Sequence, residues 1–440
     1  MTRPETICAL ASGAPPAAIA VVRVSGPAVM AMVNRMCGGS LEPRMTSLRT
    51  LKDQDGHAID SALVTYMPGP QSYTGEDVLE VSLHGGRAIV DHFLDTALGF
   101  SGVRLAKPGE FTRRAFEAGK LDLIEAEGIA DAIEADSRAQ KDLALRQLGG
   151  ALSEVYGRWR SDLLRALALL DVSIDFPDED DAPDETGGPV DAILTTLTAE
   201  ISTTLDDGSI GEKIRDGFHV AIVGPPNAGK SSLLNALARR DAAIVTDIPG
   251  TTRDVVEVRL TLGGHIVWLS DTAGLRDTDD VVEAEGVRRA RRVSERADLR
   301  IHMVDGDDPV PPDGPVKPHD LVVFNKVDLG SDLAAVDDAL PVSVTTGAGL
   351  EHLEATLERW LHGMLTGSEP PLITRVRHRA GLSDGLMHLK DARQLIADGA
   401  GAELVAESVR LAERCFAALI GAVSVEDVLG AVFSEFCIGK

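Results

Sequence analysis

The stretch GPPNAGKS, at Gly224–Ser231, predicts a phosphate-binding loop. An apolar run, HVAIVG, leads into it, and SLLNALA follows with the composition of a helix. A strand, a glycine-rich turn and the start of a helix form the context that such a loop requires. The backbone N–H groups of the turn point at phosphate oxygens, and the helix adds the positive end of its dipole. Lys230 can reach the terminal phosphates of a nucleotide, and the Ser231 hydroxyl can ligate Mg²⁺.

The DTAG motif at Asp271–Gly274 predicts the magnesium side of a GTPase site. It follows the strand-like HIVWLS, so Asp271 can hold Mg²⁺ through water while the Gly274 N–H meets the γ-phosphate. Many signalling GTPases carry a glutamine directly after this motif to orient the attacking water, but Leu275 stands here and cannot do so. Another group must position the water and offset the charge that develops between the phosphates.

Oxygen atoms around the phosphate loop can hold a cation that offsets the charge developing between the phosphates. Asn227 offers a carbonyl oxygen beside the phosphates, and TDIPGTTRD (Thr246–Asp254) offers backbone oxygens, with Thr252 suited to Mg²⁺. Such a ring of oxygens can seat a monovalent cation where an arginine would otherwise lie. Glu283 can hold the attacking water, and the alternative interpretation of Glu283 is an ordinary exposed glutamate.

Two further motifs select guanine. NKVD at Asn325–Asp328 follows the apolar LVVF, and the carboxylate of Asp328 can accept two N–H groups of guanine but meets unfavourable groups on adenine. SVTTGAG at Ser343–Gly349 stands where the loop that closes over the base belongs, with Val344 in place of the usual alanine. The four motifs together predict a GTPase domain.

The composition is that of an acidic protein with sizeable hydrophobic cores. Its 440 residues are 44% hydrophobic, carry a formal net charge of −26 and suffice for two or three domains. The charge disfavours bulk attraction to nucleic acid, but the basic stretches Val287–Arg296 and Arg375–Arg379 can act locally or be solvated helix faces. The four cysteines lack metal-ligand spacing and no apolar run reaches the length of a membrane span, which favours a cytoplasmic protein without membrane contact.

Hydrophobic patterning divides the chain into four segments. Residues 1–118 alternate β-like runs (AIAVVRV, SALVTYM and DVLEVSL) with helical patterns, which predicts an α/β domain. Residues 119–216 have helical spacing and an acidic connector at Phe176–Pro189, and residues 368–440 return to helical spacing. The GTPase segment, 217–367, lies between them. The most economical arrangement is one all-helical domain whose two halves pack together, with the GTPase domain inserted between them.

Segments outside the GTPase motifs resemble the MnmE (TrmE) family of tRNA-modification GTPases. These segments are VVRVSGP at Val21–Pro27, SYTGEDVLEVSLHGG at Ser72–Gly86, KPGEFTRRAFEAGKLDLIEAEGIADAI at Lys107–Ile133, DFPDE at Asp175–Glu179 and FCIGK at Phe436–Lys440. Within the GTPase segment, GTTRD and DTAGLRDT, with Leu275 in the usual glutamine position, resemble the broader family of translation- and RNA-linked GTPases. The likeness to the MnmE (TrmE) family covers essentially the whole chain.

The resemblance implies an N-terminal α/β domain that binds tetrahydrofolate and forms a homodimer, an all-helical central domain, and an inserted P-loop GTPase domain with a mostly parallel sheet. It implies that GTP and potassium bring two G domains together. With an FAD-dependent partner, MnmG (GidA), in a heterotetramer or larger complex, the family installs an aminomethyl or carboxymethylaminomethyl group at carbon 5 of the tRNA wobble uridine. The one-carbon unit comes from 5-formyl- or 5,10-methylene-tetrahydrofolate. The flavin belongs to the partner, since no G-x-G-x-x-G follows a strand here.

The family's binding residues carry over to matching positions of this sequence. The residues expected to bind potassium are Asn227, Thr246, Ile248 and Thr251. Mg²⁺ is expected to be bound by Ser231 and Thr252, and the attacking water to be positioned by Glu283. The residues expected to bind folate are Arg23, Glu80, Lys120 and Lys440. The basic side chains suit the carboxylates of folate, and Glu80 suits the N–H donors of its pterin. Without the resemblance, each of these residues would be interpreted as a surface charge. The full set expected to bind nucleotide and its metals is Asn227, Ala228, Gly229, Lys230, Ser231, Ser232, Thr246, Asp247, Ile248, Pro249, Gly250, Thr251, Thr252, Asp271, Thr272, Ala273, Gly274, Asn325, Lys326 and Asp328.

Cys437 is expected, beside Glu283, to take part in chemistry. It lies near the chain end, and a thiolate can take part in one-carbon transfer; the alternative is a small buried apolar residue. The sequence departs from the family at Ser12–Pro16, where a Thr- and Gly-rich turn is usual. It departs again at Leu83, which replaces a common cysteine and excludes a catalytic thiol there.

Three functions are open at this point. The first is the GTPase half of a two-protein enzyme that modifies the wobble uridine of tRNA. The second is a GTP-driven RNA-binding switch in ribosome assembly without one-carbon chemistry, which needs a basic RNA-binding module where the sequence after Pro371 predicts helices. The third is a folate-binding protein whose GTPase controls oligomerisation. We expect the first.

Overall fold

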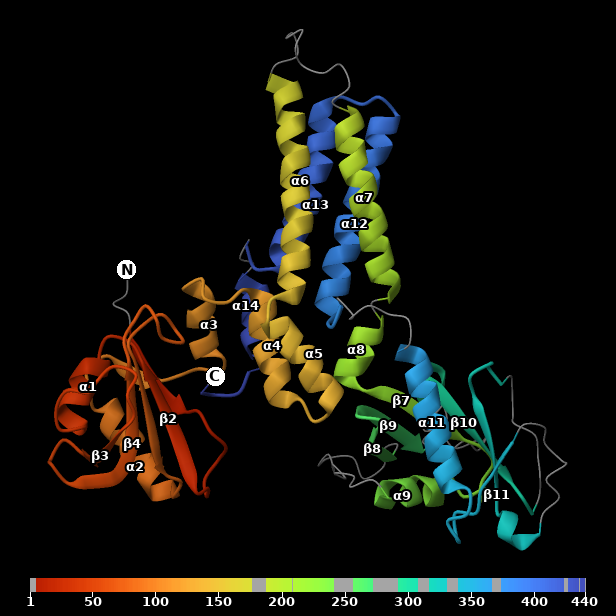
Figure 1. Cartoon of the computed structure of the whole chain (residues 1–440), viewed down its shortest axis with the longest axis horizontal. Helices are drawn as coiled ribbons and strands as arrows, with labels where there is room; N and C mark the ends of the chain where they lie inside the picture. Colours follow the sequence, from red (N-terminus) through yellow and green to blue (C-terminus); the bar gives the residue numbers. More distant parts are fainter. Residues whose placement is uncertain are drawn as a thin grey trace, which may run out of the picture. The chain divides into compact units, whose positions relative to one another are not determined.

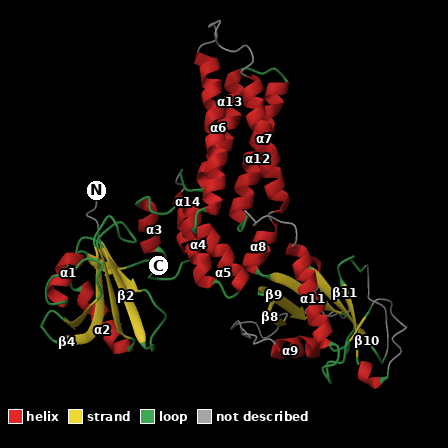
Figure 2. Cartoon of the chain, in the orientation of Figure 1, coloured by secondary structure: helices red, strands yellow, loops and turns green. Residues whose placement is uncertain are grey.

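The computed structural model describes residues 5–175, 187–207, 209–240, 256–271, 292–307, 316–330, 339–365, 373–422, 426–434 and 436–439. The chain falls into two compact units, each built from more than one stretch of sequence. One contains Met1–Ile133, Leu145–Ile193 and Asp391–Lys440, and the other contains Glu134–Ala144 and Leu194–Lys390. Figure 1 labels their elements, and Figure 2 distinguishes the helices from the two sheets.

The first unit begins with a six-stranded sheet. Its elements are β1 (Thr6–Leu10), β2 (Ile19–Ser25), α1 (Val29–Met36), β3 (Ser47–Lys52), β4 (Ala58–Met67), β5 (Val78–His84), α2 (Arg87–Leu98) and β6 (Val103–Leu105). The strand order is β3-β4-β5-β2-β1-β6, antiparallel throughout except for the parallel pair β1–β6. Buried and partly exposed residues alternate along β2, as expected for a strand with one face on the core. That face packs against α1 and α2, whose Met32 and Phe93 are fully buried.

The second unit holds the other sheet. Its elements are β7 (Phe218–Val223), α9 (Lys230–Arg240), β8 (Val256–Leu262), β9 (His265–Asp271), β10 (Leu299–Asp305), β11 (Leu321–Asn325), η1 (Val327–Leu329), β12 (Leu340–Pro341) and α11 (Leu350–Leu365). The order is β12-β11-β10-β7-β9-β8, parallel except for the pair β8–β9. Parallel strands end at one edge of a sheet, so the last residues of β7, β9, β10 and β11 line that edge.

The remaining elements are helices. They are α3 (Glu110–Glu117), α4 (Leu123–Glu134), α5 (Arg138–Leu148), α6 (Ala151–Asp175), α7 (Gly187–Asp207), α8 (Ser209–Asp216), α12 (Val376–Ala397), α13 (Ala402–Leu419) and α14 (Glu426–Ser434). Helices α6 and α13 run side by side (Figure 1) and are joined by an ion pair between Arg160 and Glu413 at 2.7 Å. In the described parts of the chain, no helix combines the length and apolar character that crossing a membrane requires.

The structure confirms the predicted fold class. An α/β region comes first, helices far apart in the sequence pack together, and the P-loop domain with its mostly parallel sheet is inserted between them. The three β-like runs correspond to β2, β4 and β5. The connector Phe176–Pro189 lies outside the described residues up to position 186, and α7 begins at Gly187.

Replacing Trp159 by alanine should lower the free energy of unfolding of the first unit by about 3–5 kcal/mol, because the substitution leaves a cavity between α6 and α13. Trp159 is 1% exposed, and its ring centroid lies 5.5 Å from that of Tyr156 and 6.3 Å from that of Phe416. Urea unfolding followed by far-ultraviolet circular dichroism measures the loss. Leu164→Ala, on the same helix but 45% exposed, is the matched control and should cost less than about 0.5 kcal/mol. Equal costs for the two variants would contradict this account of the packing.

Candidate nucleotide and ligand sites

The phosphate-binding loop runs from the end of β7 into the first turn of α9. Gly224, Asn227 and Gly229 have positive φ angles of 150°, 65° and 99°. A Cβ atom on Gly224 would lie 2.5 Å from the backbone oxygen of Met303, and one on Gly229 would lie 2.3 Å from Nδ2 of Asn325. Only glycine fits at these two positions, so packing as well as turn geometry requires the glycines of the motif.

Lys230 lies at the start of α9 and is 7% exposed. Its ammonium donates hydrogen bonds to the backbone oxygens of Gly224 (2.9 Å) and Pro225 (2.8 Å), so the side chain folds back along the loop. Burial lowers the pKa of Lys230, while the Asp271 carboxylate acts to raise it. A buried cation at a helix N-terminus fits a phosphate group, which can replace the two carbonyl oxygens as its partner.

Ser231 and Asp271 form the second part of the site. The Ser231 hydroxyl donates a hydrogen bond to Oδ2 of Asp271, which ends β9 and is 6% exposed. The parallel pairing of β7 with β9 brings the first residue of DTAG to the last residue of the phosphate loop. A hydroxyl and a carboxylate in contact fit Mg²⁺, whose other ligands are phosphate and water. The rest of the motif, Thr272, Ala273 and Gly274, lies outside the described residues.

Asn325 joins three of the predicted motifs. It ends β11 and is 4% exposed. Its Nδ2 donates a hydrogen bond to the backbone oxygen of Ala228 (2.8 Å), and its Oδ1 accepts one from the Val344 N–H (3.2 Å). One buried amide therefore fixes the phosphate loop to the loop predicted to close over the base. Val344 preserves the backbone N–H that this contact uses.

Asp328 lies in η1 and its side chain is exposed. Lys326 and Gly330 flank the short helix with left-handed backbone conformations, at φ of 66° and 81°. The Lys326 ammonium donates a hydrogen bond to Oδ2 of Asp305 at 2.7 Å, which raises the pKa of Lys326 above its ordinary value. An exposed carboxylate on a tight turn after β11 is accessible to a purine base bound at the edge of the sheet.

Other expected nucleotide-site residues are placed only in part. Ser232 is exposed on α9. The residues of the neighbouring segments that are expected to bind the nucleotide, potassium, magnesium or the attacking water lie outside the described residues; they are Thr246, Asp247, Ile248, Pro249, Gly250, Thr251, Thr252 and Glu283.

The basic stretch Arg375–Arg379 takes part in the fold of the second unit. Arg375 is 9% exposed and His378 is fully buried, while Arg379 pairs with Glu212 of α8 at 2.9 Å. These contacts contradict a fully solvated helix face for this stretch. Of the other basic stretch, Val287–Arg296, the structure describes only the part from Arg292 onward.

In the first unit, Arg23 and Glu80 face each other across β2 and β5. Their closest nitrogen and oxygen atoms are 2.8 Å apart. The guanidinium lies over the ring of Tyr73, 5.0 Å from its centroid, and 5.7 Å from that of Phe111, which are cation–π distances. The structure thus brings together two of the residues expected to bind folate.

Lys120 lines a cavity of about 460 Å³ together with Asp122, Ser153 and Gly421. Neither Arg23 nor Glu80 is among the described residues that line this cavity.

The C-terminal tail lies against β1. Cys437 is exposed, and its backbone oxygen accepts a hydrogen bond of 3.5 Å from the Gly109 N–H. A Cβ atom on Gly439 would lie 2.0 Å from the backbone oxygen of Leu10. Leu10 follows Ala9, the residue paired with Arg23 across the sheet, so the tail reaches the strand beside Arg23. Lys440 lies outside the described residues.

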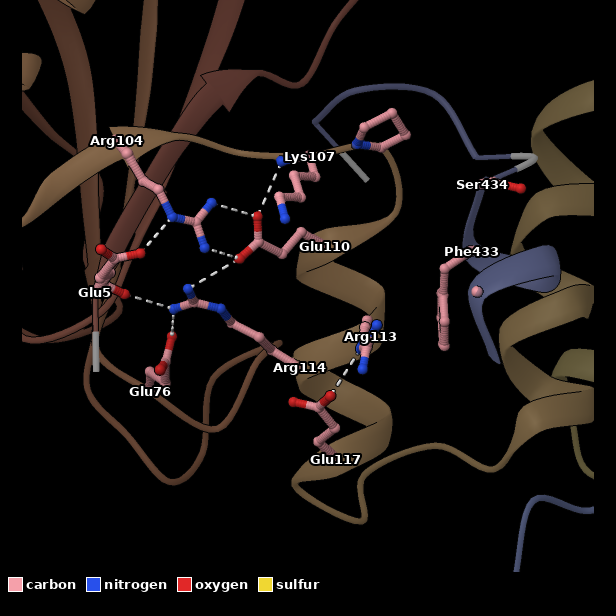
Figure 3. A pocket seen from close by; sticks show the side chains of 12 residues that line it. Glu5, Glu76, Arg104, Lys107, Glu110, Arg113, Arg114, Glu117, Phe433 and Ser434 are labelled. Carbon is pink, nitrogen blue, oxygen red and sulfur yellow. Dashed lines mark hydrogen bonds and ion pairs between the residues drawn. The ribbon is translucent and has the colours of Figure 1, made fainter. Parts of the chain in front are cut away.

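A cavity of about 610 Å³ lies beside α3, near the start of β1 (Figure 3). Glu110 is held there by two arginines: Arg104 contacts its two oxygens at 2.7 and 2.6 Å, and Arg114 contacts one at 3.1 Å. Partial burial acts to raise the pKa of Glu110, but hydrogen bonds from Arg104 and from the Lys107 backbone N–H bring it down to about 2. Arg104 also pairs with Glu5 at 2.5 Å.

The charges of this cavity balance. Its lining contains four carboxylates and four cations, namely Glu5, Glu76, Glu110, Glu117, Arg104, Lys107, Arg113 and Arg114. The cavity was not predicted from the sequence, although the motif KPGEFTRRAFEAGK contains half of its lining residues. The spacing of that motif gives no sign of Glu5, which is 99 residues from its partner Arg104.

Comparisons with known proteins cover the whole chain. A family model described as the MnmE helical domain matches residues 123–437, and one described as the N-terminus of GTP-binding protein TrmE matches residues 6–120. The tRNA modification GTPase MnmE of Hyphomonas neptunium is 57% identical over 441 residues, 100% of each chain. That of Caulobacter vibrioides is 49% identical over 449 residues, 99% of this chain and 100% of the relative.

Among solved structures, Era of Aquifex aeolicus with bound GDP and AlF4⁻ is 25% identical, with a TM-score of 0.28, and the match covers 39% of this chain and 66% of Era. The assignment rests instead on the full-length relatives and the two family models. On those grounds, the chain belongs to the MnmE (TrmE) family of tRNA modification GTPases.

Proposed function

We propose that this protein is the GTP-hydrolysing half of a two-protein enzyme that modifies carbon 5 of the tRNA wobble uridine with an aminomethyl or carboxymethylaminomethyl group. The other half is an FAD-dependent partner of the MnmG (GidA) type. The 57% identity to an MnmE over the whole chain carries the proposal, because it includes the N-terminal and helical regions as well as the nucleotide motifs. The functional segments are 1–118 for folate and dimerisation, 119–216 and 368–440 for the helical domain, and 217–367 for GTP.

The contacts of the nucleotide site support binding of GTP with Mg²⁺. Lys230 and the N-terminus of α9 hold the phosphates, while Ser231 ligates Mg²⁺ and Asp271 holds it through water. The bound Mg²⁺ neutralises charge on the phosphates. Asp328 accepts the guanine N–H groups, and Asn325 keeps the base loop and the phosphate loop in register.

Potassium completes the hydrolytic site in this proposal. Asn227 is exposed in a left-handed conformation at the turn of the phosphate loop, which leaves its side chain accessible to a cation. Thr246, Ile248 and Thr251 supply further oxygens and Thr252 a second Mg²⁺ ligand, while Glu283 orients the attacking water. The cation takes the place of an arginine finger, and the G domains of a cytoplasmic homodimer meet across their nucleotide faces.

Arg23, Glu80, Lys120 and Lys440 bind the folate. The contact between Arg23 and Glu80 places both side chains at the same point of the sheet, where the Glu80 carboxylate suits the paired N–H donors of the pterin. The bound 5-formyl- or 5,10-methylene-tetrahydrofolate supplies the one-carbon unit. Cys437 is exposed on the tail that lies along β1, within the same unit as Arg23, and acts as the thiol for one-carbon transfer.

The C-terminal segment disfavours the alternative of an RNA-binding switch in ribosome assembly. From residue 373 onward, the described chain consists of α12, α13, α14 and their connections. A KH-type RNA-binding module requires strands as well as a GxxG loop, and the described part of this segment provides no strand for it.

Deleting the gene should remove a carbon-5-modified wobble uridine from cellular tRNA, as measured by mass spectrometry of its nucleosides. The wild-type chain should restore the nucleoside, whereas Glu283→Gln should not, because the attacking water is no longer held. Glu351→Gln changes a glutamate of the same segment whose side chain is 87% exposed, and this control should restore the nucleoside. An unchanged nucleoside profile after deletion would favour a folate or RNA switch instead.

Asp328→Asn should weaken GTP binding about 10- to 150-fold, the value of hydrogen bonds to a charged group. Titration with a fluorescent GTP analogue measures the change. Asp307→Asn removes one exposed charge near Lys326 at the same edge of the sheet and should leave the affinity near that of the wild type. If Asp328→Asn binds GTP as tightly as the wild type does, Asp328 is not the guanine-binding residue.

GTP turnover should be faster in potassium than in sodium at equal ionic strength. Asn227→Ala should reduce the potassium-stimulated rate on the order of 100-fold, the effect of losing one preorganised charge contact. Asn235→Ala, on the exposed face of α9, is the matched control and should retain potassium stimulation. Equal turnover of the wild type in the two salts would rule out the cation.

A further inference from the structure

The loop Ser72–Glu76, between β4 and β5, is held in place by polar contacts to two other elements. Thr74 is 1% exposed, and its hydroxyl lies 2.7 Å from the hydroxyl of Ser25 on β2. Ser25 donates a hydrogen bond of 2.7 Å to Oε2 of Glu76. Arg114 of α3 donates one of 2.8 Å to the same oxygen (Figure 3), so the loop is fixed both to the sheet and to α3.

Tyr73 of this loop lies against the guanidinium of Arg23. Its ring centroid is 5.0 Å from Cζ of Arg23, a cation–π distance. The Tyr73 hydroxyl lies 2.9 Å from that of Thr112, which is fully buried on α3, so the ring cannot turn away without losing this contact. The Arg23 guanidinium also lies 2.8 Å from Glu80. A ring and a carboxylate therefore fix the long side chain of Arg23 before any ligand binds.

Gly75 of the same loop lies against Lys120. Its φ angle is 83°, and a Cβ atom on it would lie 3.4 Å from Cε of Lys120 and 3.0 Å from Cβ of Ala118. The side chain of Lys120 is thus beside the backbone two residues after Tyr73. One short loop therefore contacts two cations, Arg23 and Lys120, that are far apart in the sequence.

We propose that Tyr73 is a positioning residue of the folate site: it holds Arg23 in place, on a loop that also borders Lys120. This assignment rests on the folate binding proposed above. The glutamate tail of a folate carries two carboxylates, which suit two cations. A guanidinium that is already held in one orientation loses less rotamer freedom when it binds a carboxylate, so Tyr73 raises the affinity without touching the ligand.

Calorimetric titration of the full-length protein with 5-formyl-tetrahydrofolate tests the contribution to affinity. Tyr73→Leu keeps an apolar side chain but removes the ring, and should weaken binding about 2- to 30-fold, the range of a cation–π contact. Tyr73→Phe keeps the ring and should bind within about twofold of the wild type. In an Arg23→Met background, Tyr73→Leu should have no further effect, because the tyrosine acts through the arginine.

The NMR signal of the Arg23 Nε–H group gives a second readout, which needs no ligand. The nearby ring should shift this signal away from that of a free arginine, and its loss in Arg23→Lys identifies it. The shift should disappear in Tyr73→Leu and persist in Tyr73→Phe. Tyr66→Leu is the matched control, because Tyr66 belongs to the core cluster on the other face of the sheet, and it should change neither the signal nor the affinity.

Three results would overturn the proposal. They are an unmoved Arg23 signal in Tyr73→Leu, equal folate affinities of Tyr73→Leu and the wild type, and an equal effect of Tyr73→Leu with and without Arg23, which would assign Tyr73 a packing role only. If the wild type binds no folate while the Arg23 signal responds as expected, the folate assignment is wrong and the positioning of Arg23 by Tyr73 is supported.

Discussion

The loop proposed to bind phosphate has no room for a side chain at two positions. The backbone of Met303 closes the space beside Gly224, and the amide of Asn325 closes the space beside Gly229. Met303 comes from β10 and Asn325 from β11, so strand order, rather than the loop alone, determines the cradle. The same amide then holds the Val344 N–H, which makes the base side of the site a continuation of the phosphate side.

The residues proposed for the nucleotide site could be recognised in the sequence because they are close together along the chain or directly follow strands. Gly224–Ser231 is contiguous, and Asp271 and Asn325 each end an apolar run. Strands β2, β4 and β5 were identifiable because buried and more exposed residues alternate along each of them. β3 alternates only between exposed and half-exposed residues over most of its length, and β6 has three residues, so neither gives a hydrophobic period to detect.

Contacts between distant residues could not be predicted in this way. Arg23 and Glu80 were both recognised, but as separate ligand contacts, whereas the β2–β5 register makes them partners. The pairing of Arg104 with Glu5 spans 99 residues and depends on the parallel pairing of β6 with β1. Arg379 likewise pairs with Glu212 across 167 residues. A net charge of −26 thus describes the protein as a whole and says little about how its individual arginines are used.

The packing of α6 on α13 also affects synthesis of the chain. Arg160 and Glu413 are 253 residues apart, a distance that a ribosome covers in about 13–50 s at about 5–20 residues per second. Throughout that interval Trp159 has no Phe416 to pack against, so the apolar face of α6 stays uncovered while the inserted GTPase segment emerges and folds. The packing around Trp159 is therefore completed only after α13 has been synthesised.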